Sequence, residues 1–241
     1  MKRIFFLWLL SFFIAEESQA ACLGSFVSCN KMNPMPEIVF KTSYGKLKTD
    51  FSHTTNQLTA ESTEGKGEKE SGVYTAGLAR KGFGWYIYVS QAEVKYVDDK
   101  TYCVLPTKIE AYLGMVRTSI SVSSDIPKES CRFALVLRHE QIHQWINKLT
   151  LEYFLPIYYK EVQKTVREVR AVKVSSRDEV QEGMKKLNEY YKARLEPIYN
   201  QFYEAVAGEH KKLDNWVNYN AEDKLCREFD EKQKLLNQTF D

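Results

Sequence analysis

The spacing of apolar residues changes near Ser130, and this change predicts a protein made of two kinds of structure. Between residues 37 and 124, short runs rich in β-branched and aromatic residues are separated by turn residues, which is typical of β-strands. The clearest runs are residues 37–41, 84–90, 94–97 and 119–123. The polar, glycine-bearing residues 61–72 predict an exposed loop.

After Ser130, apolar residues recur at helical spacing. The predicted helices cover residues 133–149, 151–174, 178–208 and 222–236. Residues 175–177 predict the turn of a long antiparallel helical hairpin, and Pro197 predicts a kink or break in its second arm. We therefore predict an α+β fold, in which a small, mainly antiparallel sheet is followed by a helical region.

The composition is that of a folded globular protein, with 44% hydrophobic and 27% charged residues in 241. We expect a single domain over residues 21–241, strand-rich from 21 to 130 and helical from 131 to 241. The net charge is only +2, and no patch combines aromatic and basic residues, so we expect no nucleic-acid partner.

The first twenty residues have the pattern of a secretory signal peptide. A basic start at Lys2 and Arg3 precedes an apolar run over residues 4–15, and small residues follow around Ala20. The apolar run is too short for a membrane span, which needs about 20 residues. We therefore predict export to the periplasm or the medium, without a stable transmembrane span. Acylation of Cys22, which would give a lipid anchor, is the alternative.

The five cysteines all lie after the predicted signal peptide, in a compartment where disulfides persist. The simplest pairing joins Cys22 to Cys29 and Cys103 to Cys131, and it leaves Cys226 unpaired. If Cys22 carries a lipid, the other four form two disulfides. The sequence does not decide between the two arrangements.

The strongest local motif is HExxH, formed by His139, Glu140 and His143. Residues four apart lie on one face of a helix, so the two imidazoles can converge on one cation. Zinc accepts neutral histidine nitrogens, and a glutamate beside a zinc-bound water acts as general base in hydrolysis. The motif therefore predicts zinc ligands at His139 and His143 and a catalytic role for Glu140, on a helix that packs against the sheet.

The third zinc ligand has less support in the sequence. One zincin class has a glycine and a histidine shortly after the motif, where this chain has Ile146 and Leu149, so that class is excluded. Another class uses a glutamate from a later helix. The glutamates in that range are Glu161, Glu168, Glu204 and Glu209. We predict His210 as the third ligand because it is the only histidine after the motif.

The segment from Leu135 to His143, behind a signal peptide and a strand region and before a helical hairpin, resembles the DUF922-like family of secreted bacterial zinc proteases. The resemblance covers about residues 70–220 and rests mainly on the HExxH core, which also resembles zincin-type zinc metallopeptidases in general. The family carries a downstream Asp-x-x-Thr-x-His-Gly segment. Here Asp214 begins the counterpart, and Tyr219 stands at the histidine position. The resemblance implies zinc-dependent peptide hydrolysis, with Tyr219 as a further candidate ligand or oxyanion donor.

These patterns together predict an exported zinc metallopeptidase that acts on a peptide or protein substrate. The alternative is a non-catalytic binding protein of the cell envelope, in which the histidines hold a structural metal or none. The sequence does not identify the substrate, the position of cleavage or the oligomeric state.

Overall fold

The structure of the protein is a computed structural model that describes residues 29–63 and 74–240, with side chains up to residue 235. The predicted signal peptide over residues 1–20 and the candidate lipid site at Cys22 lie outside the described residues. Most of the predicted loop at residues 61–72 also lies outside them, and its first residues belong to a helix.

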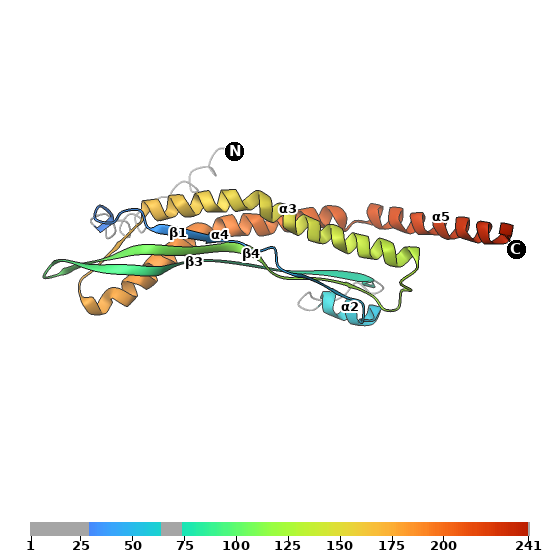
Figure 1. Cartoon of the computed structure of the whole chain (residues 1–241), viewed down its shortest axis with the longest axis horizontal. Helices are drawn as coiled ribbons and strands as arrows, with labels where there is room; N and C mark the ends of the chain where they lie inside the picture. The colour runs from blue at the N-terminus through green and yellow to red at the C-terminus, as the bar shows by residue number, and fades with distance from the viewer. Residues whose placement is uncertain (1–28, 64–73, 241) are drawn as a thin grey trace, which may run out of the picture. The chain divides into compact units, whose positions relative to one another are not determined.

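Strands and a short helix alternate in the described part of the strand-rich region (Figure 1). The strands are β1 (Glu37–Lys41), β2 (Leu47–Asp50), β3 (Gly77–Asp98) and β4 (Thr101–Val122), and helix α2 (Thr55–Thr63) lies between β2 and β3. The bounds of β1 match the prediction. The separate runs predicted at residues 84–90 and 94–97 form parts of one long strand, β3, which pairs with β4 across a two-residue turn.

The mixed α and β content confirms the predicted fold class, but the prediction of a mainly antiparallel sheet is wrong. Strand β1 pairs in parallel with residues 108–112 of β4, and β2 pairs in parallel with residues 118–121. Strand β5 (Val172–Val174), which lies in the helical part of the sequence, pairs antiparallel with β4. Alternating side chains predict that a segment is a strand, but they carry no information about the direction of its partner.

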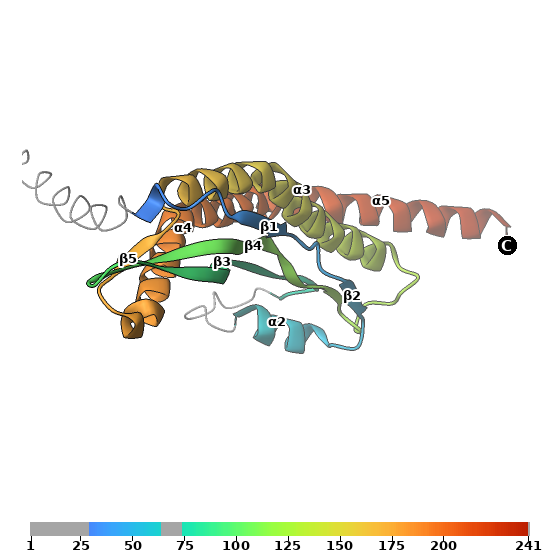
Figure 2. The same cartoon turned by 60° about the vertical axis from the view of Figure 1, so that its left-hand side comes forward.

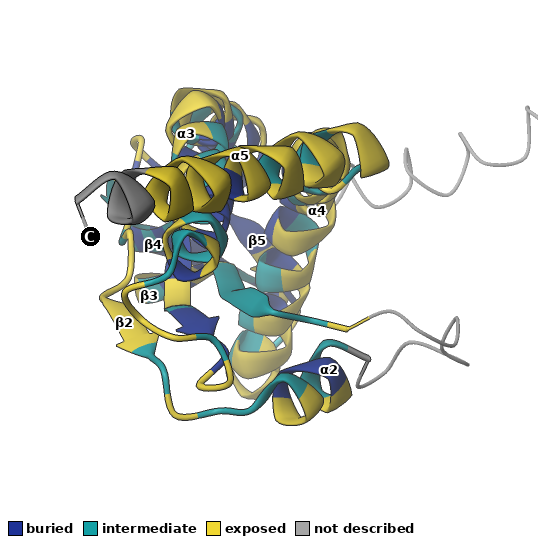
Figure 3. Ribbon diagram, turned by 90° about the vertical axis from the view of Figure 1, so that its right-hand side faces the viewer, coloured by how far each residue is buried: buried dark blue, intermediate teal, exposed yellow. Residues whose placement is uncertain are grey.

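Three long helices make up most of the described residues after Ser130, namely α3 (Cys131–Glu168), α4 (Val180–Leu213) and α5 (Trp216–Phe240). Helix α3 merges two predicted helices and continues through Pro156, and α4 continues through Pro197. No helix within the described ranges is both long and apolar enough to cross a membrane. Much of α5 is exposed, as Figure 3 shows.

Contacts between α3 and α4 confirm the predicted antiparallel helical hairpin. Glu168 near the end of α3 forms an ion pair with Arg194 in the first half of α4. Phe154, earlier in α3, packs edge-on against Phe202, later in α4, with ring centroids 5.6 Å apart. The connection between the helices is more than a turn, because it contains β5 and a 3-10 helix at Arg177–Glu179.

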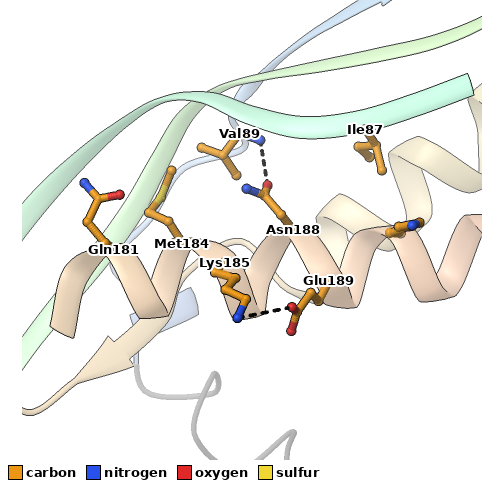
Figure 4. A pocket seen from close by; sticks show the side chains of 8 residues that line it. Ile87, Val89, Gln181, Met184, Lys185, Asn188 and Glu189 are labelled. Carbon is orange, nitrogen blue, oxygen red and sulfur yellow. Dashed lines mark hydrogen bonds and ion pairs between the residues drawn. The ribbon is translucent and has the colours of Figure 1, made fainter.

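The chain divides into two compact units, each of which takes residues from both parts of the sequence. Unit 1 comprises Met1–Lys41, Tyr86–Tyr112 and Ile157–Pro197. Its core includes the fully buried rings of Tyr158 and Tyr191. Figure 4 shows a pocket of this unit between α4 and β3, where Asn188 accepts a hydrogen bond from the backbone N–H of Val89. Its lining contains no histidine or cysteine.

Unit 2 comprises Thr42–Trp85, Leu113–Pro156 and Ile198–Asp241, and it contains the HExxH motif. Its hydrophobic core joins Ile120 and Val122 of β4 to Phe133 of α3. The amide of Gln144 on α3 donates to the backbone carbonyls of Arg80 on β3 and Ser119 on β4. The HExxH helix therefore packs on the sheet, as predicted, and α2 lies on the opposite side of the strands from α3 (Figure 2).

The disulfides differ from the simplest predicted pairing. Cys29 is bonded to Cys103, and Cys131 is bonded to Cys226. The pairing agrees with the alternative given above, in which the four cysteines other than Cys22 form two disulfides. The simplest pairing is wrong because spacing along the sequence does not reveal which cysteines the fold brings together.

The Cys131–Cys226 disulfide joins the start of α3 to α5, so its removal should both destabilise the protein and loosen α5. It closes a loop with a sequence separation of 95 residues. Replacing both cysteines with serine should lower the free energy of unfolding by about 2–5 kcal/mol, as measured in urea. A variant with serine at Cys29 and Cys103 is the control. An unchanged unfolding midpoint after loss of Cys131 and Cys226 would contradict this assignment.

Candidate metal centre

The HExxH motif lies in the first half of α3 and is buried. His139, Glu140 and His143 are 5%, 6% and 8% exposed. Because α3 is uninterrupted over the motif, the two histidine rings lie on one face of the helix. Their centroids are 4.9 Å apart in an edge-to-face arrangement. The two imidazoles are thus close enough to share one ion.

Asp214 completes a three-residue group with the two histidines. It lies in the short connection between α4 and α5. Its Oδ1 atom is 3.1 Å from Nε2 of His139 and 3.0 Å from Nε2 of His143. Atoms from all three side chains lie within 4.8 Å of one another, so the group could hold a metal ion. Two imidazole nitrogens and a carboxylate oxygen are a common donor set for divalent transition metals.

The second nitrogen of His139 is held by α5. Its Nδ1 atom lies 3.2 Å from Oε1 of Glu222, and a carboxylate can only accept this hydrogen bond. Such carboxylate partners orient metal-binding histidines and increase their basicity. Tyr219 adds to this arrangement, because its ring stacks on His139 and its hydroxyl donates to Oδ1 of Asp214 over 3.0 Å.

The second nitrogen of His143 is held by a chain of side-chain amides that begins at the sheet. The amide nitrogen of Gln144 faces two backbone carbonyls, so its oxygen faces Asn147 and accepts a hydrogen bond from that amide. The oxygen of Asn147 then faces Nε2 of His210, at 2.8 Å. His210 therefore carries its proton on Nε2, and its Nδ1 is free to accept.

His210 Nδ1 lies 2.5 Å from Nδ1 of His143. Since His210 accepts there, His143 donates from Nδ1. Its Nε2 atom, which faces Asp214, is then the nitrogen that would bind a metal. Burial, together with repulsion by Lys81 and His143, lowers the pKa of His210 to about 4, so His210 is neutral as this network requires.

The hydrogen bonds between His139 and Asp214 favour a protonated imidazole and an ionised carboxylate. Burial opposes ionisation of both His139 and Asp214, but the hydrogen bonds they share outweigh it. The pKa of His139 is raised to about 9 by its bonds with Asp214 and Glu222, and the pKa of Asp214 is lowered. A metal ion at this place would take the position of the His139 Nε2 proton, because metal ligands must be deprotonated.

Glu140 is held beside the histidines by the start of β3. Burial raises its pKa, although the two neighbouring histidines and a hydrogen bond from the backbone of Ala79 act in the opposite direction. Gly77 leaves the space that the carboxylate occupies: a Cβ atom there would lie 2.6 Å from Oε1 of Glu140 and 2.6 Å from Cγ1 of Val136. A buried carboxylate with a raised pKa is suited to exchange protons near neutral pH.

Replacement of Gly77 with alanine should therefore disturb Glu140. We expect a loss of about 1–3 kcal/mol in the free energy of unfolding, because the added methyl group overpacks the site. Gly208 on α4 is the matched control, because a Cβ there meets nothing within 4 Å. Alanine at Gly208 should stabilise the helix by about 1 kcal/mol. Thermal unfolding of the two variants measures both effects, and equal melting temperatures would contradict the close approach at Gly77.

The structure brings some of the candidate ligands to the group and gives the others different partners. His210 contacts His143, but it is not one of the three residues that converge, because Asp214 takes that place. The predicted glutamates have other surroundings: Glu161 pairs with Lys164, Glu168 with Arg194 and Glu209 with Lys212, and Glu204 is exposed.

Three residues of the site did not emerge as candidates from the sequence: Asp214, Glu222 and Asn147. In the sequence, Asp214 stands out only as the first residue of the segment that is compared with a family motif. Glu222 begins a predicted helix rich in charge, so its role has no local sequence signal. Asn147 follows His143 by one helical turn, and this spacing alone predicts that it lies on the same helix face as the two histidines.

The contact between Glu222 and His139 gives a third test. Replacing Glu222 with glutamine keeps an acceptor for the Nδ1–H group but removes the charge. Loss of an outer partner of this kind typically weakens metal binding by about 10- to 100-fold. Zinc affinity measured by competition with a chelator should fall accordingly. The same change at Glu228 should leave it unaltered, because Glu228 is exposed on α5 and pairs with Lys224; equal affinities for both variants would count against the contact.

Comparison of the chain with protein-family models, with curated proteins and with solved structures finds no match in any of the three. The resemblance to secreted zinc proteases therefore stays a prediction from the HExxH motif and its surroundings.

Proposed function

We propose that this chain is an exported zinc metallohydrolase that cleaves peptide bonds. The observation that carries the proposal is the convergence of His139, His143 and Asp214, whose ligand atoms lie within 4.8 Å of one another, beside the buried Glu140. An HExxH motif without a third donor is weak evidence for catalysis, because histidines and glutamates are common on helices. Asp214, a third donor from a distant part of the chain, strengthens the evidence for a metal site.

The donor set fits zinc. Two histidine nitrogens and one carboxylate oxygen leave a coordination position open, as catalytic zinc sites require. Each histidine also has an outer hydrogen-bond partner, Glu222 for His139 and His210 for His143. When bound, zinc would polarise a substrate carbonyl and lower the pKa of a bound water. In this proposal His210 orients His143 and does not bind the metal itself.

Glu140 is the proposed general base. It would take a proton from the attacking water and deliver it to the leaving amine. Its raised pKa supports this role, because a base is most effective when its pKa approaches the working pH. Tyr219 would keep Asp214 in place through its hydroxyl and keep the His139 ring in place through stacking.

A second metal is compatible with the same ligands. Two histidines and one carboxylate also bind iron(II) in non-haem oxygenases. The buried carboxylate of Glu140 favours zinc and hydrolysis, because water activation needs a base and dioxygen activation at iron does not require one in this position. Metal analysis of the purified protein distinguishes the two.

Export is part of the proposal. The amino-terminal pattern is that of a signal peptide, and the two disulfides are compatible with an oxidising compartment.

The test uses the mature chain, produced with its disulfides and loaded with one equivalent of zinc. It should cleave a mixture of unstructured peptides, as detected by mass spectrometry. A chelator should stop cleavage, and added zinc should restore it. Cleavage that persists after complete metal removal, or a protein that binds no zinc, would rule out the proposed reaction. Zinc binding without cleavage of any peptide would favour the alternative of a binding protein with a structural metal.

A further inference from the structure

The two faces of β3 near the metal group carry basic residues with different surroundings. Arg80 points away from α3, forms an ion pair with Glu61 of α2 and donates to the Ser121 hydroxyl over 3.3 Å. Side chains alternate between faces along a strand, so Lys81 must point the other way. The neighbouring residues on its face agree. A Cβ at Gly77 would meet Glu140, and the Phe83 ring packs on Phe202 of α4 with centroids 4.8 Å apart.

Lys81 therefore lies on the strand between Gly77, which is next to Glu140, and Phe83, which packs on α4. It interacts electrostatically with Asp214 and with His210, two members of the metal group and its outer network. Its side chain is partly buried, which disfavours a charged ammonium and lowers its pKa to about 8. It nevertheless keeps its charge at neutral pH.

No carboxylate of the described residues forms an ion pair with Lys81. Asp214, the acidic group that acts on Lys81, already contacts Nε2 of both histidines and accepts from the Tyr219 hydroxyl. A partly desolvated ammonium that lacks a direct ion pair lowers its free energy by binding an anion, and an ammonium–carboxylate hydrogen bond is among the stronger contacts in proteins.

We propose that Lys81, which the alternation of β3 places on the face of the metal group, binds a carboxylate of the substrate next to the scissile bond. This inference rests on the proposed function and narrows its substrate to peptides with a carboxylate beside the cleaved amide. Two sources have this chemistry, a free carboxyl terminus and an acidic side chain. Lys81 touches the substrate in this account, so it decides specificity, whereas the metal ligands and Glu140 carry the reaction.

The test measures binding, so that it does not depend on turnover. The protein is the zinc-loaded mature chain with Glu140→Gln. The probes are two pairs of short peptides: N-acetyl-Phe-Leu with a free carboxyl terminus and its amide, and N-acetyl-Phe-Leu-Glu-amide and its Gln counterpart. In at least one pair, the carboxylate should bind about 10- to 100-fold more tightly than its neutral partner, as measured by calorimetry. The pair that shows the difference identifies the source.

Adding Lys81→Met should reduce that ratio to about one without weakening binding of the neutral peptide, and Lys81→Arg should keep part of it. Lys81→Gln serves if the methionine variant does not fold. Lys95→Met is the control, because Lys95 is an exposed lysine on the same strand. The inference is overturned if neither pair shows a preference or if the preference survives loss of Lys81. Absence of cleavage by the unmutated chain tests the proposed function separately.

Discussion

Glutamine in place of Glu140 should lower the rate of peptide hydrolysis by about 10²- to 10⁴-fold, the usual contribution of a general base. The bound zinc should remain, because Glu140 is not one of the three converging ligands. Glutamine has nearly the same shape and can still accept the hydrogen bond from Ala79, so the fold should be unaffected.

Two measurements check this prediction: kcat/KM on a cleaved peptide and zinc content by elemental analysis. Glu152→Gln is the matched control, since Glu152 is exposed on the same helix and pairs with Lys148. A Glu140→Gln protein with unchanged kcat/KM would show that the carboxylate takes no part in the reaction. A variant that also loses its zinc would show that Glu140 contributes to metal binding.

Alanine in place of Asp214 should weaken zinc binding by more than about 100-fold, which is more than the loss of an outer partner costs. Phenylalanine in place of His210 should weaken zinc binding less, by about 10- to 100-fold, because His210 holds a ligand and does not bind the metal itself. The order follows from the geometry. Asp214 Oδ1 is about equally close to both Nε2 atoms, whereas His210 touches only the far nitrogen of His143.

The two variants are compared by competition with a chelator of known affinity. Asp223→Ala controls for loss of an acidic residue, because Asp223 is exposed on α5 and pairs with Arg132. If His210→Phe lost more affinity than Asp214→Ala, the third ligand would be the histidine that the sequence favoured, and the network around it would have to be reassigned.

The features of the fold that depend on neighbouring residues can be predicted from the sequence. Periodicity alone predicted β1 and the HExxH helix, because each depends on residues that are neighbours in the chain. The predicted helical hairpin also holds, since α3 and α4 contact each other at Glu168–Arg194 and at Phe154–Phe202. The parallel pairing of β1 and β2 with β4 could not be predicted in the same way, because strand direction depends on the path of the chain between strands.

The third metal donor is the clearest non-local feature. Asp214 reaches the histidines only because α4 returns along α3 and ends beside them. Chemistry at the sequence level favoured His210 over any single acidic residue, and the fold did bring His210 to His143. His210 contacts Nδ1 of His143, the nitrogen that faces away from Asp214. No rule of sequence spacing distinguishes the two nitrogens of a histidine.

The most direct test of the account is the position of zinc in crystals of the mature protein, located by anomalous scattering at the zinc absorption edge. We expect one strong peak bonded to Nε2 of His139, Nε2 of His143 and the carboxylate of Asp214, with His210 outside bonding distance. A peak bonded to His210 in place of Asp214, or the absence of any peak at these histidines in zinc-saturated crystals, would contradict it.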